Sequence, residues 1–361
     1  MSIYTRFFLS FLFFAVLFGC KKTEDKQGRA MVDSTGFATQ AYQMDSITAR
    51  IHRLQGQEMD SLENNGKIQS WKTVISPHDD YSYVGYLYPG ALSKIQSGQV
   101  VLIGVAHRAE EFNLKDKIVF GKYDYWKSPC GKVKVSHFRE KLINQLPGEA
   151  YTVHNQMHEA EHSLEAIIPF IQQNNPSVKI TPVLIPYMKF ESLKKNARMF
   201  SEALHNIAER EDLQWGKDFT IVISSDAVHY GDKDWDGKNF AKYGADTSGY
   251  EKALQYERSL IDSTLTGAMT TKKIRDFYYS TVKKGNYKEY KWTWCGRFSI
   301  PFGLLTSINL SEQKGDTLSG VLIDYSTSIA DKAIPVDDIQ MGHTAPANIR
   351  HWVGYASVGY E

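Results

Sequence analysis

The chain has 361 residues, of which 42% are hydrophobic and 13% aromatic, as in an ordinary globular protein. Lys and Arg number 42 against 41 Asp and Glu, so the formal net charge is +1. Such an even balance provides no basic surface for nucleic acid, and we exclude nucleic-acid binding as a function.

The N-terminus has the pattern of a secretory signal. Arg6 precedes an apolar run from Phe7 to Phe18, which is too short for a comfortable membrane span. The run ends in Leu17-Phe18-Gly19-Cys20, which resembles the bacterial lipobox, where the cysteine is acylated and becomes the first mature residue. We predict a lipoprotein signal peptide over residues 1–19 and lipidation of Cys20. The alternative is an uncleaved anchor helix ending near Gly19.

The segment that follows is polar and charged. We expect residues 20–45 to form the lipidated cysteine and a flexible tether, and residues 46–361 to form one α/β domain. The predicted location is the cell envelope, where the lipid anchors the protein on the periplasmic or surface-exposed face of a bacterial membrane.

Four short apolar runs predict buried strands. Each is rich in β-branched residues and lacks alternation, which is typical of strands covered on both faces. The runs are Thr73–Ser76, Val100–Val105, Ile180–Ile185 and Phe219–Ile223. Helical patterns lie between and after them, at Glu161–Gln173 with a kink or break at Pro169, at Phe190–Glu209 and at Tyr250–Thr264. This order predicts an α/β fold with a central, mostly parallel or mixed sheet flanked by helices.

Histidines and an acid follow three of these strands. His78 follows the first strand, His107 the second, and Asp226 with His229 the last. In open α/β sheets, sites form outside the carboxyl ends of the strands. A single histidine there is more often structural, but three such placements favour a shared site.

The segment from His158 to Glu165 is a dense cluster of acids and imidazoles. If it is helical, His158 and His162 share one face, and Glu161 and Glu165 share another. The order His-Glu-x-x-His of zinc proteases is absent. We assign a site role to His162 and Glu165. We interpret Glu159 instead as a solvent-exposed acid in the first turn of a helix.

Several ordered motifs resemble the Memo family (AmmeMemoRadiSam system protein B). They begin at Ser76-Pro77-His78, Ile103-Gly104-Val105-Ala106-His107, Glu161-His162-Ser163, Ser224-Ser225-Asp226 and Cys295-Gly296-Arg297, and Tyr355–Tyr360 resembles the family's final strand. The resemblance spans roughly residues 70 to 361. One departure is Asp79-Asp80, where the family usually has Ala-Gly.

The resemblance implies a fold similar to class III extradiol dioxygenases, with metal ligands His78, His107 and Cys295. It also implies that His162, Asp226 and His229 line the same pocket, and that Asp226 or Glu165 orients an imidazole. Imidazole and thiolate ligands suit a transition metal ion, for which we expect iron or copper rather than zinc.

Two cysteines beyond Cys20 leave three arrangements open. Cys130 and Cys295 form a disulfide, remain two free thiols, or divide into a structural and a functional thiol. We predict a free Cys295 that faces the histidines, with a pKa lowered by metal or by a cation such as Arg297, and a structural Cys130 in a turn.

These observations leave three classes of function. The first is a metal-dependent, dioxygenase-like or redox enzyme acting on a small molecule, with His229 or His162 as acid or base near the open site. The second is a non-catalytic envelope protein that binds a metal or a protein partner. The third is metal-assisted hydrolysis, which Asp79 and Asp80 favour slightly.

Overall fold

A computed structural model describes residues 27–64 and 70–361. Among these residues, thirteen strands form one mixed sheet, whose main path runs β1-β5-β6-β8-β3-β9-β2-β15-β14-β11. Its strands are β1 (Gly28–Arg29), β2 (Thr73–Ser76), β3 (Gln99–Val105), β4 (Ile118–Phe120), β5 (Tyr125–Ser128), β6 (Gly131–Val135), β7 (Tyr151–Val153), β8 (Lys179–Ile185), β9 (Phe219–Ser224), β10 (His229–Gly231), β11 (Gly267–Ala268), β14 (Ser319–Thr327) and β15 (His351–Tyr360). A separate hairpin joins β12 (Val282–Lys283) to β13 (Asn286–Tyr290).

The centre of the sheet is parallel. Strands β6, β8, β3, β9 and β2 are neighbours in that order and run in the same direction. They include all four predicted strands, and those predictions are confirmed. Successive residues point to opposite faces, so Val74 packs in one core and Ile75 in the other. Both faces are therefore buried, which explains why these strands read as continuous apolar runs.

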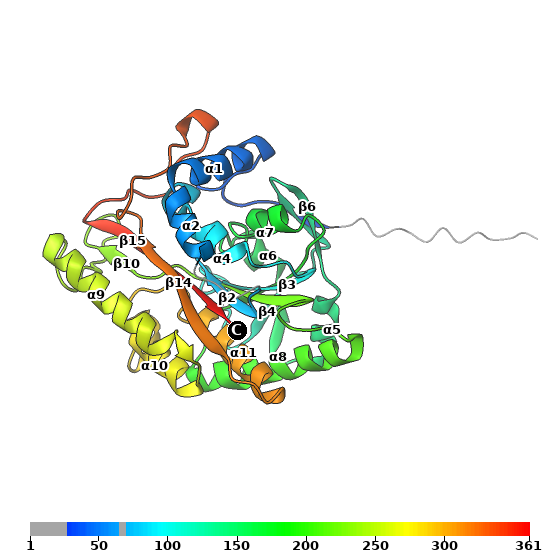
Figure 1. Cartoon of the computed structure of the whole chain (residues 1–361). Coiled ribbons are helices and arrows are strands. Elements are labelled where there is room, and N and C mark those ends of the chain that lie inside the picture. Colours follow the sequence, from blue (N-terminus) through cyan, green and yellow to red (C-terminus); the bar gives the residue numbers. More distant parts are fainter. Residues whose placement is uncertain (1–26, 65–69) are drawn as a thin grey trace, which may run out of the picture.

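Helices cover both faces (Figure 1). One layer contains α5 (Phe138–Gln145), α8 (Phe190–Glu211), α9 (Thr247–Thr264), α10 (Thr271–Thr281) and α11 (Ser299–Gln313). The other contains α1 (Ala41–Leu54), α2 (Gly56–Asn64), α3 (Tyr81–Val84), α4 (Leu87–Leu92), α6 (Asn155–Glu159) and α7 (Ile168–Asn174), and a 3-10 turn spans Asp337–Ile339. The protein is thus a single α/β domain with a large mixed sheet between helices, as predicted.

The last strand joins the parallel centre to an antiparallel flank. Strand β15 is buried along its whole length and pairs antiparallel with both β2 and β14, for example Val358 with Ile75. Strand β10 pairs with its beginning. The predicted closing strand at Tyr355–Tyr360 is confirmed. It brings the C-terminal segment next to the strand that precedes His78.

One predicted helix was wrong over its first half. Residues 160–167 form turns, and α7 begins only at Ile168, with Pro169 in its first turn. Proline lacks an N–H donor and has a fixed φ, so it suits the start of a helix better than its interior. His158 and His162 consequently do not share a helix face. The predicted helices Phe190–Glu209 and Tyr250–Thr264 correspond to α8 and α9 and are confirmed.

The N-terminal boundary of the fold also differs from the prediction. Strand β1 pairs parallel with β5, and the side chain of Arg29 is 1% exposed, so part of the expected 20–45 tether belongs to the domain. Its first residues are fixed mainly by polar contacts, whereas Phe37, Ala38 and Met44 join a hydrophobic core, and the polar composition alone indicated a tether. The predicted signal peptide, Cys20 and the tether up to residue 26 lie outside the described residues. Within the described part of the chain, the helices are too short or too polar to cross a membrane.

Candidate metal centre

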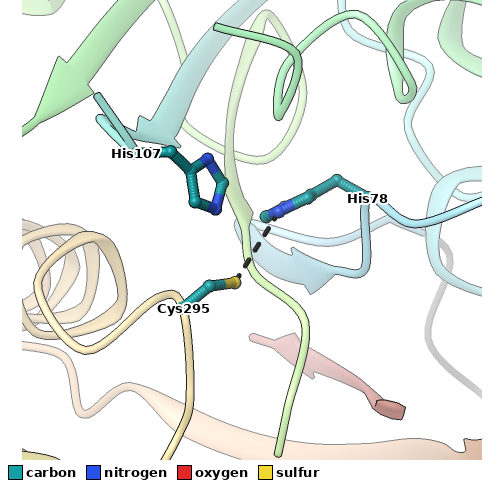
Figure 2. A group of neighbouring side chains, drawn as sticks. All are labelled: His78, His107 and Cys295. Atoms are coloured by element: carbon teal, nitrogen blue, oxygen red, sulfur yellow. Dashed lines mark hydrogen bonds between the residues drawn. The ribbon is translucent and has the colours of Figure 1, made fainter. Parts of the chain in front are cut away.

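Three side chains converge at the carboxyl edge of the parallel strands. His78 lies just after β2, His107 just after β3, and Cys295 in the loop that leads into α11. Figure 2 shows the two imidazole rings and the sulfur turned toward one another. Their potential ligand atoms all lie within 4.8 Å of one another, and Nε2 of His78 is 3.6 Å from Sγ of Cys295. These three residues form a possible metal-binding cluster.

A hydrogen-bond chain fixes the ring of His78. The Ser224 hydroxyl donates to the carbonyl of Ser163 at 2.6 Å, so its oxygen is left to accept from Nδ1–H of His78 at 2.7 Å. A neutral imidazole that donates through Nδ1 has its lone pair on Nε2. The Nε2 lone pair of His78 therefore faces Cys295, as metal ligation requires.

Glu161 fixes the ring of His107 in the same way. Its carboxylate accepts the backbone N–H of His107 at 2.8 Å and the ring Nδ1–H at 2.9 Å. It also accepts the backbone N–H of Ser163 at 2.8 Å, which holds the carboxylate in place. Glu161, and not Glu165, is thus the acid that orients an imidazole. A carboxylate behind a ligating histidine sets its tautomer and strengthens its basicity.

Cys295 is held close to the loop after β9. Its sulfur is buried and accepts the backbone N–H of Asp226 at 3.1 Å. A side chain at Gly296 would bring its Cβ to 2.1 Å from Oγ of Ser225, so only glycine permits this approach. Both Cys295 and Cys130 are free thiols, and Cys130 is exposed in the turn between β5 and β6. The disulfide alternative is not formed in this structure.

Arg297 does not serve as the cation beside the thiol. Its guanidinium lies 3.5 Å from the centre of the Tyr290 ring and donates to the carbonyl of Lys288 at 2.9 Å. Burial raises the pKa of the Cys295 thiol, and a hydrogen bond with His107 opposes that rise. Burial alone would lower the pKa of His107, but Glu161 and Cys295 raise it well above its ordinary value. Protons therefore occupy this cluster readily when no metal ion displaces them.

A cavity of about 550 Å³ opens beside the two histidine ligands. His162, His229 and Asp226 line it, as the family resemblance implied. The complete lining is Val32, Asp33, Ser34, Thr35, Phe37, His78, Asp79, Asp80, His107, His162, Asp226, His229, Trp235, Thr344, Ala345, His351 and Val353. The cavity gives a small molecule direct access to the two candidate histidine ligands.

Two of the three further histidines that line the cavity, His162 and His229, have geometries that can be described from their neighbours. The ring of His162 stacks on His107, with centroids 4.9 Å apart, and its side chain is 41% exposed. His229 is near the Thr293 carbonyl, with Nδ1 at 3.2 Å, so its Nε2 carries the lone pair. Burial lowers the pKa of both histidines, so both are neutral bases near pH 7.

Asp226 contacts both a candidate histidine ligand and the candidate cysteine ligand. Its Oδ1 accepts the backbone N–H of His78 at 2.8 Å, while its own backbone N–H donates to the sulfur of Cys295. Its Oδ2 lies 3.4 Å from Nε2 of His78. Burial and the nearby charge of Asp79 raise the pKa of Asp226 well above its usual range. The residue fixes the spacing between a histidine ligand and the cysteine ligand.

The two unusual carboxylates after His78 are both engaged. Asp79 accepts the hydroxyl of Tyr355 at 2.8 Å. Asp80 accepts the backbone N–H of Thr344 at 2.7 Å and its hydroxyl at 2.9 Å. Burial raises the pKa of Asp80 to about 7. Asp79 and Asp80 therefore bind Tyr355 and Thr344 of the C-terminal segment, and their carboxyl groups are not left free to face the candidate metal ligands.

Glu165 has another role than predicted, and His158, to which no role was assigned, is a buried structural residue. Glu165 forms a buried ion pair with Arg29 at 2.5 Å instead of orienting a histidine. His158 is buried, with Nε2 3.2 Å from the Val119 carbonyl and its ring against Trp126. Because residues 160–167 are turns, their side chains do not follow the helical spacing that was assumed.

Sequence reasoning missed several cavity residues. Trp235 and His351 stack on each other with ring centroids 3.7 Å apart, and both line the cavity. Val32–Thr35 and Thr344 also line it, from segments with no motif or strong apolar pattern. Only contacts across the fold place these residues, so the sequence carried no signal for them.

Comparison with known proteins yields a consistent set of matches. A family model described as Memo-like protein matches residues 37–338. A MEMO1 family protein of Aquifex aeolicus is 26% identical over 262 residues, covering 71% of this chain and 79% of that protein. MEMO1 family proteins of Pyrococcus furiosus and Methanothermobacter thermautotrophicus are each 25% identical over 47% of this chain, and the matches span 57% and 58% of those proteins.

Proposed function

The chain belongs to the Memo-like protein family, and from that premise we propose that it binds one transition metal ion and uses it in an oxidative reaction on a small molecule. The proposed ligands are His78, His107 and Cys295. One observation carries the proposal. Nδ1 of His78 donates to Ser224 and Nδ1 of His107 donates to Glu161, so the Nε2 atom of each ring is left for the space beside the cysteine sulfur.

The donor set fits a transition metal ion. Two neutral imidazoles and a thiolate suit iron, copper or zinc, whereas magnesium and calcium prefer oxygen ligands. Three protein ligands leave coordination positions open, as catalytic sites require. We propose iron or copper, because these metals can supply redox chemistry and because the chain resembles non-haem iron dioxygenases.

The remaining cavity residues would act around the bound ion. His229 and His162 are neutral imidazoles at the cavity surface, so each can accept a proton from a bound molecule. Asp226 is proposed as a positioning residue, because it contacts the backbone of His78 and the sulfur of Cys295 at once. A small molecule in the cavity would contact the histidine ligands together with these bases, which line the same cavity.

We further propose that the protein works at the cell envelope as a lipoprotein. The proposal is supported by the Gly19-Cys20 motif after the apolar run, with Cys20 carrying the lipid. Membrane contact would then be through the lipid anchor. A protein partner at the envelope belongs to the non-catalytic alternative.

Oxygen consumption separates the enzyme from a protein that only binds metal. Full-length protein is loaded anaerobically with Fe(II), freed of unbound iron, and mixed with limiting oxygen, with a matched Cys295→Ala sample receiving the same iron. We expect wild-type protein to hold about one iron per chain and to consume oxygen faster than the variant. Tight iron binding without oxygen consumption beyond that of the variant would support the metal-binding alternative.

A further inference from the structure

Two segments outside the range of the family match meet over the cavity. Residues 32–36 precede the matched range of 37–338, and residues 342–345 follow it. Val32, Asp33, Ser34 and Thr35 from the first segment, and Thr344 and Ala345 from the second, line the cavity. We call residues 32–36 and 342–345 the strap. The candidate ligands thus lie within the matched range, whereas these six lining residues lie outside it.

A buried latch fastens the N-terminal part of the strap. Arg29 is 1% exposed, pairs with Glu165 and donates to the carbonyls of His158 and Glu161. Its guanidinium also lies 4.1 Å from the centre of the Trp126 ring. The Glu165 carboxylate in turn accepts the backbone N–H groups of Val32 at 3.0 Å and Asp33 at 2.7 Å. A buried charge pair with all these partners holds the strap in one position, because a broken pair would leave a charge unsatisfied.

Further contacts hold the first segment of the strap in a turn, join it to the second segment and place it against Asp80. Oδ1 of Asp33 accepts the backbone N–H groups of Thr35 and Gly36, which turns the chain toward the cavity. The backbone N–H of Gly342 donates to the Thr35 carbonyl at 2.9 Å and joins the two halves. A Cβ at Gly36 would lie 1.9 Å from Oδ1 of Asp80, so glycine is required where the strap passes this carboxylate.

The wall of the cavity is rich in acceptors and poor in positive charge. Its described lining includes the carboxyl groups of Asp33, Asp79, Asp80 and Asp226, and it contains neither Lys nor Arg. His351 supplies an independent sign of a ligand. It is 2% exposed, its Nδ1 is 3.0 Å from the Lys233 carbonyl, and its Nε2 has no hydrogen-bond partner within the described chain. An imidazole that donates through Nδ1 leaves Nε2 as an unsatisfied acceptor.

We propose that the strap is the specificity-determining wall of the cavity, and that it admits polar small molecules that carry hydrogen-bond donors and no negative charge, such as amines. Asp33 is the residue that sets this preference, because it is the acidic side chain that the strap contributes to the lining. Carboxylates and phosphates would meet the like charge of Asp33 there, and the lining offers no Lys or Arg side chain to pair with them. The inference rests on the proposed metal site, which provides its readout.

The test uses two small probes of different charge on full-length protein loaded with Co(II). Azide is an anion and imidazole is neutral, and binding of either at an open cobalt position changes the visible absorption spectrum. The substitution Asp33→Asn removes the charge, while the amide oxygen can still accept from Thr35 and Gly36. We expect Asp33→Asn to strengthen azide binding by about threefold or more and to leave imidazole binding within about twofold. Asp45→Asn, at an exposed position on α1, is the matched control.

Arg29→Met tests the latch with the same probes. We expect both probes to bind faster, and a protease to cut within the strap sooner than in wild-type protein. If this variant does not fold, Asp33→Asn still decides the matter. Cobalt-loaded wild-type protein whose azide affinity is the same with Asp33→Asn would overturn the strap proposal alone. A wild-type protein that takes up no cobalt would overturn the proposed function, and the strap proposal with it.

Discussion

The carboxylate of Glu161 accepts two hydrogen bonds from one residue, the backbone N–H and the ring Nδ1–H of His107. Burial alone would raise the pKa of Glu161, but the His107 imidazole and the hydrogen bonds it makes bring that pKa below its usual value. The acid is therefore ionised, and it turns one ring nitrogen of His107 away from the candidate metal and the other toward it.

Glu161→Gln tests this arrangement. The amide keeps the size of the side chain but loses the charge that raises the basicity of His107, so we expect metal affinity to fall about 10- to 100-fold. Isothermal titration with Co(II) or Zn(II) measures the change. Glu159→Gln is the control, since Glu159 is an exposed acid two residues earlier in the chain. Equal losses in both variants would argue against a specific role for Glu161.

Metal affinity should rise with pH. The pKa of the Cys295 thiol is raised by burial, and that of His107 is raised because Glu161 and Cys295 outweigh burial. Both groups must lose a proton to ligate, so metal and protons compete. We expect the apparent affinity to increase by about tenfold per pH unit for each proton released, until both groups are deprotonated. Competition titrations from about pH 6 to about pH 9 measure how steeply the apparent metal affinity rises with pH. A flat profile would contradict thiolate ligation.

Glu257 anchors the loop that carries Cys295. This buried acid of α9 accepts the indole N–H groups of Trp292 and Trp294, the backbone N–H of Val228 and the hydroxyl of Tyr325. In Glu257→Gln, the amide NH₂ would face donors, so we expect the free energy of unfolding to fall by about 1–3 kcal/mol. Urea unfolding of the metal-free protein measures it, with Glu251→Gln, exposed on the same helix, as the control. No difference between the two variants would show that Glu257 is dispensable.

Lipidation of Cys20 is tested directly in cells. Cys20→Ala removes the acceptor thiol, so we expect an unprocessed precursor that takes up no labelled fatty acid. Gel mobility and fatty-acid labelling compare it with the wild-type chain and with Cys130→Ala, which retains the motif. Normal processing of Cys20→Ala would contradict the lipoprotein proposal.

The strands and the histidine positions could be predicted from the sequence because they depend on local pattern. Apolar runs such as Val100–Val105 mark strands buried on both faces, and parallel strands end at one edge, which brings His78 and His107 together. The place of Cys295 followed only from the family resemblance. It lies far along the chain, in a loop that no periodic pattern directs toward the histidines.

The errors have a common physical origin in tertiary contacts. The family resemblance implied Asp226 or Glu165 as the acid that orients a histidine, but the turns place Glu161 at His107 and leave Glu165 to Arg29. The segment around Arg29 is polar, so composition indicated a tether. A strand pairing and a buried ion pair nevertheless make it part of the fold, and no sequence period reports such contacts.

Metal content of single variants tests the central claim most directly. Full-length wild-type protein, His78→Ala, His107→Ala and Cys295→Ala are purified alike, and bound metal per chain is measured by elemental analysis after dialysis. Glu159→Ala serves as the control for substitution as such. The proposed site predicts about one transition metal ion per chain in wild-type and control protein and a severe loss in each ligand variant. Wild-type metal content in all three ligand variants would contradict it.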